Sequence, residues 1–162
     1  MRRLFLLLIL SVVLVACSSI ECPIENAVTI NYAVMKSQGG VEVADTLKDT
    51  LSIWTRRSDG KDTLLFNRGV GVRSLQLPVS YTGDRDVLIF QVTDTFHVST
   101  IDTVWINKED IPHFESVDCA ARYFHRLTSV WSTHVAIDTI IINNSSVTYD
   151  SSVKHLYIYF KK

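Results

Sequence analysis

The sequence predicts an all-β domain, an antiparallel β-sandwich of the immunoglobulin-like or a related type with about eight or nine short strands. Two observations predict this class: apolar residues recur at every second position, and turns rich in Gly, Asp and Ser follow about every ten residues. A third observation is that no segment after residue 16 keeps the i, i+3, i+4 apolar spacing of an amphipathic helix over three turns. A β-barrel is the alternative, because strand order cannot be read from one sequence.

The first four strands are expected at residues 27–36, 49–55, 62–67 and 72–80. Asp59-Gly60, at the tip of the "RRSDGK" turn, predicts a hairpin between the second and the third. Pro78 has no amide hydrogen for a ladder, so its segment is expected to be an edge strand or to contain a bulge. Alternation places one set of apolar residues toward the core: Val28, Ile30, Tyr32, Val34, Leu51, Ile53, Leu75, Leu77 and Val79.

The C-terminal half is expected to add strands at residues 87–93, 101–107, 123–131, 135–143 and 154–160. In these strands Leu88, Phe90, Val92, Leu156, Ile158 and Phe160 are expected to face inward, with Tyr157 and Tyr159 facing outward. The best helical candidate is a short turn near residues 116–124, for which Ser116 could serve as the N-cap.

The N-terminus has the pattern of a lipoprotein signal peptide. Arg2 and Arg3 precede an apolar run of twelve residues, Leu4 to Val15, which is short of the about 20 residues that span a membrane. The run ends in "LVAC", which resembles a lipobox, so cleavage before Cys17 and lipidation of that cysteine are expected. The alternative is an ordinary secretory signal. The predicted organisation is a signal peptide at 1–16, a lipidated tether at 17–21 and one domain at 22–162.

The short tether predicts where the domain lies. Residues Ser18 to Glu21 span no more than roughly 20 Å, so the domain is expected to stay close to the membrane surface. Ser18 is not the Asp that retains some lipoproteins in the inner membrane, and Glu21 is not part of an acidic run. We therefore expect the periplasmic side of the outer membrane, with exposure at the cell surface as the alternative.

The charge balance argues against a nucleic-acid partner. Removal of residues 1–16 takes two of the 16 basic residues, and the remaining 14 face 17 acidic residues, a formal charge of −3. No Lys/Arg cluster remains that could neutralise phosphates. The expected partners are the membrane, through the lipid, and another envelope protein.

Two cysteines remain for the domain itself. In an oxidising compartment Cys22 and Cys119 are expected to form a disulfide, which would close a loop of about a hundred residues. Two free thiols or a metal-binding pair is the alternative.

The segment "HFESVDCAARYFHRL" at 113–127 has the highest density of reactive groups in the sequence. His113, His125 and His134 are weak metal candidates, because spacings of twelve and nine residues do not match a helical zinc motif. The G-x-S-x-G elbow of serine hydrolases is absent. We expect no catalytic residue, metal or cofactor, and interpret the segment as a polar joint that crosses between the sheets after Pro112.

The dipeptide Asp-Thr occurs six times, and five copies are followed by Leu, Val or Ile. Asp in a turn followed by β-branched Thr is typical of strand entry. The tripeptide also resembles the acceptor of a general O-glycosylation system of Bacteroidota. That resemblance makes Thr46, Thr50, Thr63, Thr103 and Thr139 candidate O-glycosylation sites.

The string "PHFESVDCAARYFHRLTSVWSTHVAIDTIIINN" at 112–144, with the early "ECPIENAVTINYAV" and the terminal "LYIYF", resembles a family of small Bacteroidota lipoproteins of unknown function. The resemblance covers almost all of residues 21–162. It implies an envelope lipoprotein, and it transfers no catalytic or binding role.

Three classes of function remain. The first is a non-catalytic structural or protein-interaction domain of the envelope, and the second is a module that binds carbohydrate or another small ligand. Trp54 supports the second, because it lies opposite Leu51 and Ile53, where an exposed ring can stack on a sugar. The third class, a metal-dependent or thiol enzyme, is supported only by the 113–127 segment.

Overall fold

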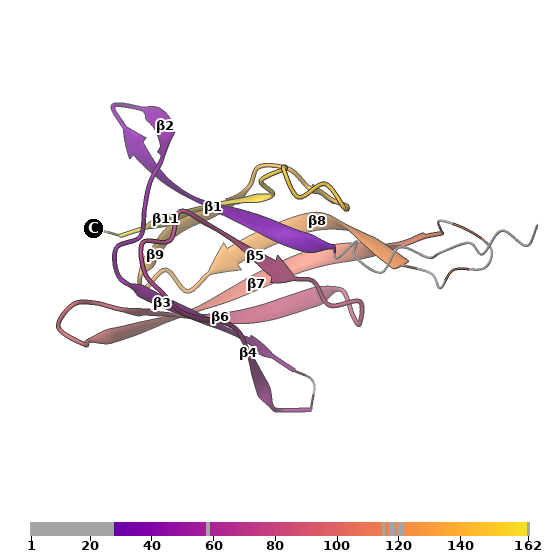
Figure 1. Ribbon diagram of the computed structural model, residues 1–162, viewed down its shortest axis with the longest axis horizontal. Coiled ribbons are helices and arrows are strands. Elements are labelled where there is room, and N and C mark those ends of the chain that lie inside the picture. The colour runs from indigo at the N-terminus through magenta and orange to yellow at the C-terminus, as the bar shows by residue number, and fades with distance from the viewer. Residues whose placement is uncertain (1–27, 58, 115, 117–118, 120–121, 162) are drawn as a thin grey trace, which may run out of the picture.

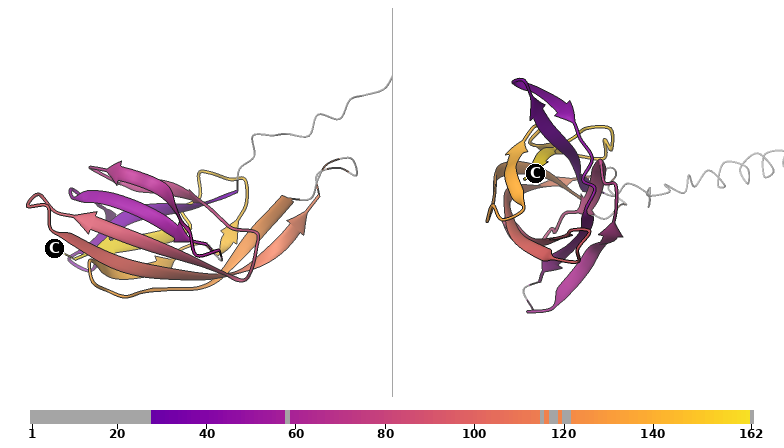
Figure 2. Two further views of the ribbon diagram at one scale, coloured as in Figure 1. Left: turned by 90° about the horizontal axis from the view of Figure 1, so that it is seen from below. Right: turned by 90° about the vertical axis from the view of Figure 1, so that its left-hand side faces the viewer.

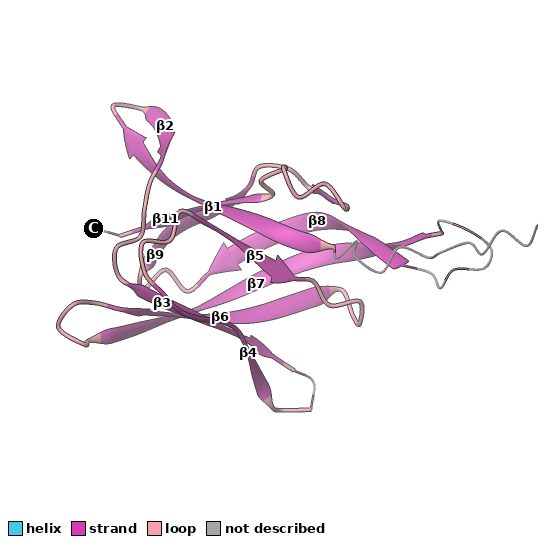
Figure 3. Ribbon diagram, in the orientation of Figure 1, coloured by secondary structure: helices cyan, strands magenta, loops and turns pink. Residues whose placement is uncertain are grey.

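The computed structural model describes residues 28–57, 59–114, 116, 119 and 122–161. These residues fold into two β-sheets without any helix, which confirms the all-β prediction (Figures 1 and 3). The described part of the chain therefore offers no helix of the length and hydropathy needed to cross a bilayer.

The described residues form eleven strands, more than the eight or nine expected. Two strands, at 41–44 and 146–147, were not predicted, because segments of four and two residues are too short to give a periodic signal. The strands are β1 (Thr29–Gln38), β2 (Val41–Ala44), β3 (Thr50–Arg56), β4 (Asp62–Gly69), β5 (Ser74–Pro78), β6 (Arg85–Thr93), β7 (Ser99–His113), β8 (Arg122–Ser132), β9 (Ile137–Ile142), β10 (Ser146–Val147) and β11 (Leu156–Phe160).

The two sheets are unequal. The smaller has the order β2-β1-β11-β9, with β5 also paired to β1, and the larger has the order β10-β8-β7-β6-β3-β4. The larger sheet curls around the smaller one (Figure 2). One pair departs from the antiparallel prediction, because β1 and β11 run parallel, with Tyr32 opposite Leu156. The architecture is a β-sandwich with one curled sheet.

The core lies between the facing surfaces of the two sheets. In β6 buried residues alternate with half-exposed ones, as a strand covered on one face requires. The inward positions predicted for the strands at 27–36, 49–55 and 87–93 are confirmed, and those residues are at most 6% exposed with the exception of half-buried Val28. Tyr32 is fully buried and packs against Phe90 across the core, with 6.3 Å between the ring centroids.

Two predictions about turns and edges are confirmed. β3 and β4 form the hairpin expected around Asp59-Gly60, and Gly60 has a φ of 78°, a conformation that glycine adopts at little cost. β5, which contains Pro78, pairs only with β1 among the described strands. Proline therefore stands on an open sheet edge, where a missing amide hydrogen is tolerated.

The interpretation of residues 113–127 as a joint between the sheets is wrong. β7 continues through Pro112 to His113 and pairs with β8 in the same sheet, with Pro112 opposite Tyr123. Beyond Asn107, β7 pairs with β8 alone, because β6 begins opposite that residue, so Pro112 again lies on a strand with one open edge.

The short helical turn predicted near 116–124 is also wrong for the residues that the structure describes. Arg122 to Phe124 belong to β8, and Ser116 and Cys119 are not helical. The long hairpin pairing of β7 with β8 overrides the weak local helical signal, and β-forming Tyr123 and Phe124 favour the strand.

One buried carboxylate fixes the crossing from β8 to β9. Asp102 of β7 is 1% exposed. Its Oδ1 accepts hydrogen bonds from the Thr133 hydroxyl (2.6 Å) and the Val135 amide (2.7 Å). Its Oδ2 accepts from the amides of Ala136 (2.6 Å) and Ile137 (2.8 Å). Four donors on a single side chain hold the turn through which the chain changes sheets.

A second polar anchor ties the C-terminal loop to β1. The amide of Asn31 donates to Nδ1 of His155 (2.9 Å), and the amide of His155 donates to the carbonyl of Asn31 (2.8 Å). The side-chain amide of Asn31 donates to the carbonyls of Ser151 (3.0 Å) and Val153 (2.8 Å). Asn31 and His155 are both 1% exposed, so this network satisfies the backbone and side-chain amides of Asn31 and Nδ1 of His155 away from solvent.

Candidate ligand-binding face

All three tryptophans of the chain lie on the outer face of the larger sheet. Trp54 follows inward-facing Ile53, and Trp105 stands between the buried Val104 and Ile106. The third, Trp131, is the cross-strand partner of Trp105. Since successive residues of a strand point to opposite faces, all three rings point away from the core.

Strand register arranges these rings in two rows across the sheet. One row runs from Leu64 on β4 through Trp54 and Ile89 to Thr103 on β7. The other runs from Val87 through Trp105 to Trp131, whose rings stack with centroids 5.6 Å apart and planes at 14°. The outer face is thus more apolar and aromatic than a solvated sheet surface requires.

A groove crosses this face at Trp54. Two cavities of about 500 and 470 Å³ share Trp54 and Gln91 in their walls, and we call the two together the Trp54 groove. The first cavity has an apolar floor that includes Ile89 and Ile101, and Ile101 is 55% exposed. This volume is within the range of small-molecule sites.

The ends of the Trp54 groove carry polar groups. At one end the Arg56 guanidinium donates to both carboxylate oxygens of Asp62, at 3.2 and 3.3 Å. At the other, Gln91 Nε2 donates to Ser99 Oγ (2.9 Å), which is 2.8 Å from the Thr93 hydroxyl. The groove therefore combines one indole ring with amide, hydroxyl, guanidinium and carboxylate groups.

Two residues that line the second cavity have backbone conformations that are rare for residues other than glycine. Arg68 and His97, which both line it, have positive φ angles of 48° and 64°. Residues other than glycine adopt this region at a cost, and such residues cluster at functional sites. At Arg68 the conformation accompanies a register shift between β3 and β4, which bends the edge of the sheet.

A separate polar cluster lies inside the sandwich, where β7 bulges between Asn107 and Lys108. Lys108 is 2% exposed, and its Nζ donates to Asp110 Oδ1 (2.5 Å) and to the carbonyl of Gly83 (2.9 Å). The same Asp110 oxygen is 2.7 Å from Nδ1 of His125. The buried ammonium is therefore neutralised by a neighbouring carboxylate, as a buried ion requires.

Burial shifts the pKa values of His125 and of Asp86, a buried carboxyl of β6 on which the charge of Lys108 acts. Burial lowers the pKa of His125, although hydrogen bonding to Asp110 opposes the shift. Burial raises the pKa of Asp86, although hydrogen bonds from Ser80 and the charge of Lys108 oppose it. Because Asp110 and His125 engage one another, we interpret the cluster as part of the core.

The three histidines that were weak metal candidates have separate surroundings. The ring of His113 stacks on Phe124 with centroids 4.1 Å apart, and His125 bonds to Asp110. Nδ1 of His134 lies 2.7 Å from the carbonyl of Asp138. In the described part of the chain, no three His, Cys, Asp or Glu side chains are grouped so that they could hold a metal ion.

The candidate modification sites differ in accessibility. Thr63 on β4 is exposed, and the other four threonines are half-buried: Thr46, Thr50, Thr103 and Thr139. Glycosylation stays a prediction for all five. Cys119 is half-buried, whereas Cys17 and Cys22 lie outside the described residues, so lipidation and the Cys22–Cys119 pairing also stay predictions.

Comparison with known proteins gives one match. Residues 50–160 match the model of a family described as "Family of unknown function (DUF6452)". The chain belongs to this family. The match extends from β3 to β11 and contains the whole Trp54 groove. No curated protein matches the chain, and no solved structure matches it either.

Sequence reasoning identified Trp54 but missed its companions. Trp105 and Trp131 carried the same signal, because each is out of phase with the apolar residues that face the core. Gln91 shares a face with Val87 and Ile89, and that spacing was also visible. That these residues lie on adjacent strands depends on the order β3-β6-β7-β8, which periodicity does not determine.

Proposed function

We propose that this protein is a non-catalytic binding domain of the cell envelope, anchored by a lipid on Cys17, that binds a carbohydrate chain in the Trp54 groove. The observation that carries the proposal is the gathering of all three tryptophans on one outer sheet face, with a groove at Trp54. Isolated exposed apolar residues need no explanation, whereas apolar and aromatic side chains gathered on one sheet face indicate a binding surface.

The chemistry of the groove fits a sugar. A sugar ring has an apolar C–H face that packs on a flat indole, and hydroxyls that both donate and accept hydrogen bonds. The Trp54 groove provides the indole, and Gln91, Thr93 and Ser99 provide amide and hydroxyl partners. The groove continues past Trp54 in both directions, which suits an extended chain more than a single compact ligand.

A second candidate is a docking surface for another envelope protein, and a different part of the same face favours it. The Arg85 guanidinium lies 5.3 Å from the centroid of the Trp131 ring, which itself stacks on Trp105. Tryptophan and arginine are the residues that dominate binding energy at protein interfaces. This candidate places the decisive contacts at Trp105 and Trp131 instead of Trp54.

The envelope location is supported by the N-terminal sequence, with its basic start, apolar run and Cys17. The sulfur of Cys119 is not a free thiol, which supports a disulfide with Cys22 and an oxidising compartment. The proposal is non-catalytic because Lys108, Asp110 and His125 engage one another inside the sandwich. Periplasmic exposure at the outer membrane remains the location that we propose.

The test is a binding measurement with purified protein. Calorimetric titration with maltohexaose, cellohexaose and chitohexaose samples neutral sugars of different linkage. We expect at least one of them to bind. Trp54→Ala should raise the dissociation constant about tenfold, because the free energy of stacking one aromatic ring on a ligand corresponds to about that factor.

Trp131→Phe is the matched control, because Trp131 is on the same face but lines neither cavity of the groove. It should bind sugar as the wild type does. An equal loss in both variants, or no binding to any of the three hexasaccharides, would reject the carbohydrate proposal and leave the protein-docking candidate.

A further inference from the structure

The β7–β8 hairpin projects beyond the smaller sheet and ends in exposed apolar side chains. In Figures 1 and 2 its end extends past the start of β1. Phe114 is 67% exposed, Ile111 43% and Tyr123 37%. Tyr81, from the loop between β5 and β6, is 71% exposed and stacks on Tyr123 with ring centroids 6.3 Å apart. We call these four residues the hairpin tip.

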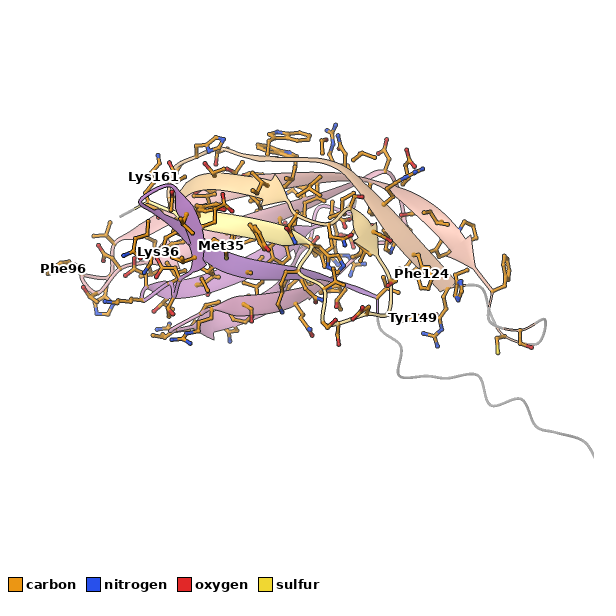
Figure 4. All side chains as sticks on the ribbon, turned by 90° about the horizontal axis from the view of Figure 1, so that it is seen from above. Met35, Lys36, Phe96, Phe124, Tyr149 and Lys161 are labelled. Carbon is orange, nitrogen blue, oxygen red and sulfur yellow. The ribbon has the colours of Figure 1, made fainter. Side chains whose placement is uncertain are left out.

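The projecting hairpin is braced on one of its two faces. The ring of Phe124 on β8 stacks on His113 of β7, with centroids 4.1 Å apart. The same ring meets Tyr149 edge to face, with centroids 4.8 Å apart (Figure 4). His113 and Tyr149 also meet edge to face, at 5.8 Å. Because three rings from three segments hold it, the hairpin points in a fixed direction, with Ile111 on the face of Phe124 and Tyr123 on the opposite face.

The start of the domain lies at the same end of the molecule. β1 begins at Thr29, near the projecting hairpin, and runs away from it (Figure 1). Cys17 precedes Thr29 by twelve positions, a tether of no more than about 43 Å. A disulfide between Cys22 and Cys119 would shorten the tether to the five positions from Cys17 to Cys22, about 18 Å. The lipid would then be attached within reach of the hairpin.

From this juxtaposition we propose that the hairpin tip rests in the interfacial layer of the membrane to which the lipid anchors the protein. The inference rests on the lipid anchor of the proposed function and adds a second, non-covalent contact. Aromatic side chains with a polar edge suit the headgroup region, and apolar Phe and Ile suit the boundary with the acyl chains.

Two contacts with the membrane would orient the domain. The tip would face the bilayer, and the opposite end, with the β6–β7 turn, would face away from it. Figure 4 shows Phe96 of that turn at the far end from Phe124. Phe96 is 84% exposed and would point away from the membrane, so it is an exposed phenylalanine that serves as a control. The outer face of the larger sheet would then stand upright beside the membrane, open to a ligand.

The experiment uses the full-length lipidated protein in vesicles of phosphatidylethanolamine and phosphatidylcholine. Zwitterionic lipids are the suitable probe, because the sequence between Phe114 and Arg122 includes Glu115 and Asp118. The photoreactive amino acid p-benzoylphenylalanine replaces Phe114 in one variant, Tyr81 in a second and Phe96 in a third. After flotation and irradiation, intact mass measures the fraction of protein that carries a cross-linked lipid.

We expect the fraction of protein with a lipid adduct to be at least about tenfold higher at positions 114 and 81 than at position 96. Transfer of one aromatic side chain from water into the membrane interface favours the membrane by about this factor. Similar or absent adducts at all three positions, in protein that floats with the vesicles, would overturn the membrane contact and leave the lipid anchor standing. Failure of the wild type to float would overturn the anchor itself, and with it the basis of this inference.

Discussion

The carboxylate of Asp102 should be among the most sensitive positions in the domain. We consider Asp102→Asn, which preserves the size and shape of the side chain. The amide nitrogen of asparagine donates, so if it faces the amides of Ala136 and Ile137, both lose their acceptor. If it faces Thr133 and Val135, the Val135 amide loses its acceptor, while the Thr133 hydroxyl can turn and accept. At least one of the four hydrogen bonds is lost whichever way the side chain turns, and the others are no longer made to a charged group.

The magnitude follows from these contacts. A hydrogen bond to a charged group contributes about 1.5 to 3 kcal/mol, so the loss of at least one predicts a fall of at least about 1.5 to 3 kcal/mol in the free energy of unfolding. Domains of this size are stabilised by about 5 to 15 kcal/mol in total, so the variant is expected to lose a substantial part of its stability. Thr133→Val removes one donor to Asp102 and also the acceptor of the Thr103 amide, and it should lower the free energy of unfolding by a similar amount.

The charge state of Asp102 predicts a second effect, on how the stability of the domain depends on pH. Burial alone would raise its pKa, but the hydrogen bonds from Thr133 and three backbone amides outweigh burial and lower the pKa below the usual value. The unfolded chain therefore takes up this proton at a higher pH than the folded one. The stability contributed by Asp102 is present above about pH 4 and is lost as the pH falls through the lower folded pKa.

The assay is urea denaturation followed by tryptophan fluorescence, at pH 7 and at steps down to pH 3. Asp138→Asn is the matched control, since Asp138 is also an aspartate followed by threonine but is exposed, and it should change the free energy of unfolding by less than about 0.5 kcal/mol. A loss for Asp102→Asn as small as that of the control would refute the claim that this carboxylate holds the β8–β9 turn.

Two further predictions concern buried polar groups. The hydroxyl of Tyr32 is buried without a hydrogen-bond partner among the described residues. Tyr32→Phe should therefore leave the urea midpoint unchanged or raise it. A fall of more than about 1 kcal/mol in the free energy of unfolding would mean that the hydroxyl does have a partner. Burial lowers the pKa of His155, whose Nδ1 must be unprotonated to accept the Asn31 amide. Its contribution to stability should be complete above about pH 6.5 and fall as the pH drops toward the folded pKa. His155→Gln should therefore reduce the change in urea midpoint between pH 7.5 and pH 5.5, and an unchanged dependence would contradict this assignment.

Much of the strand layout was predictable because a strand covered on one face needs an apolar residue at every second position. This rule placed Ile30, Leu51 and Phe90 in the core, and it placed Trp54 on the opposite face. It failed at the bulge between Asn107 and Lys108, where a lysine occupies an inward position. The charge of Lys108 is neutralised by Asp110, two residues along the same strand. Asp110 in turn contacts His125 of β8, and that contact depends on cross-strand register, which one sequence does not display.

Strand order was the larger obstacle. Pro112 suggested that the strand ends there. In the structure, β6 begins at Arg85, opposite Asn107, so β7 has only β8 as a neighbour at Pro112. Proline fits at this position because its missing amide hydrogen would face the open edge. Likewise, the two cavities at Trp54 exist because β4 and β7 flank β3 and β6, an arrangement that links segments far apart in the sequence. The groove is thus a property of topology, although alternation correctly places Trp54, Ile89 and Gln91 on the outer face.

The parallel pairing of β1 with β11 has a consequence for how the chain is completed. β2 and β5 pair with β1 from the same half of the chain, but a further edge of β1 is paired only by the last strand, since Ala33 lies opposite Tyr157 and Val34 opposite Ile158. Contacts between distant parts of a chain form slowly, because a long loop must close before they stabilise anything. A chain truncated before β11 would leave this edge of β1 unpaired, and an unpaired strand edge is a site of aggregation.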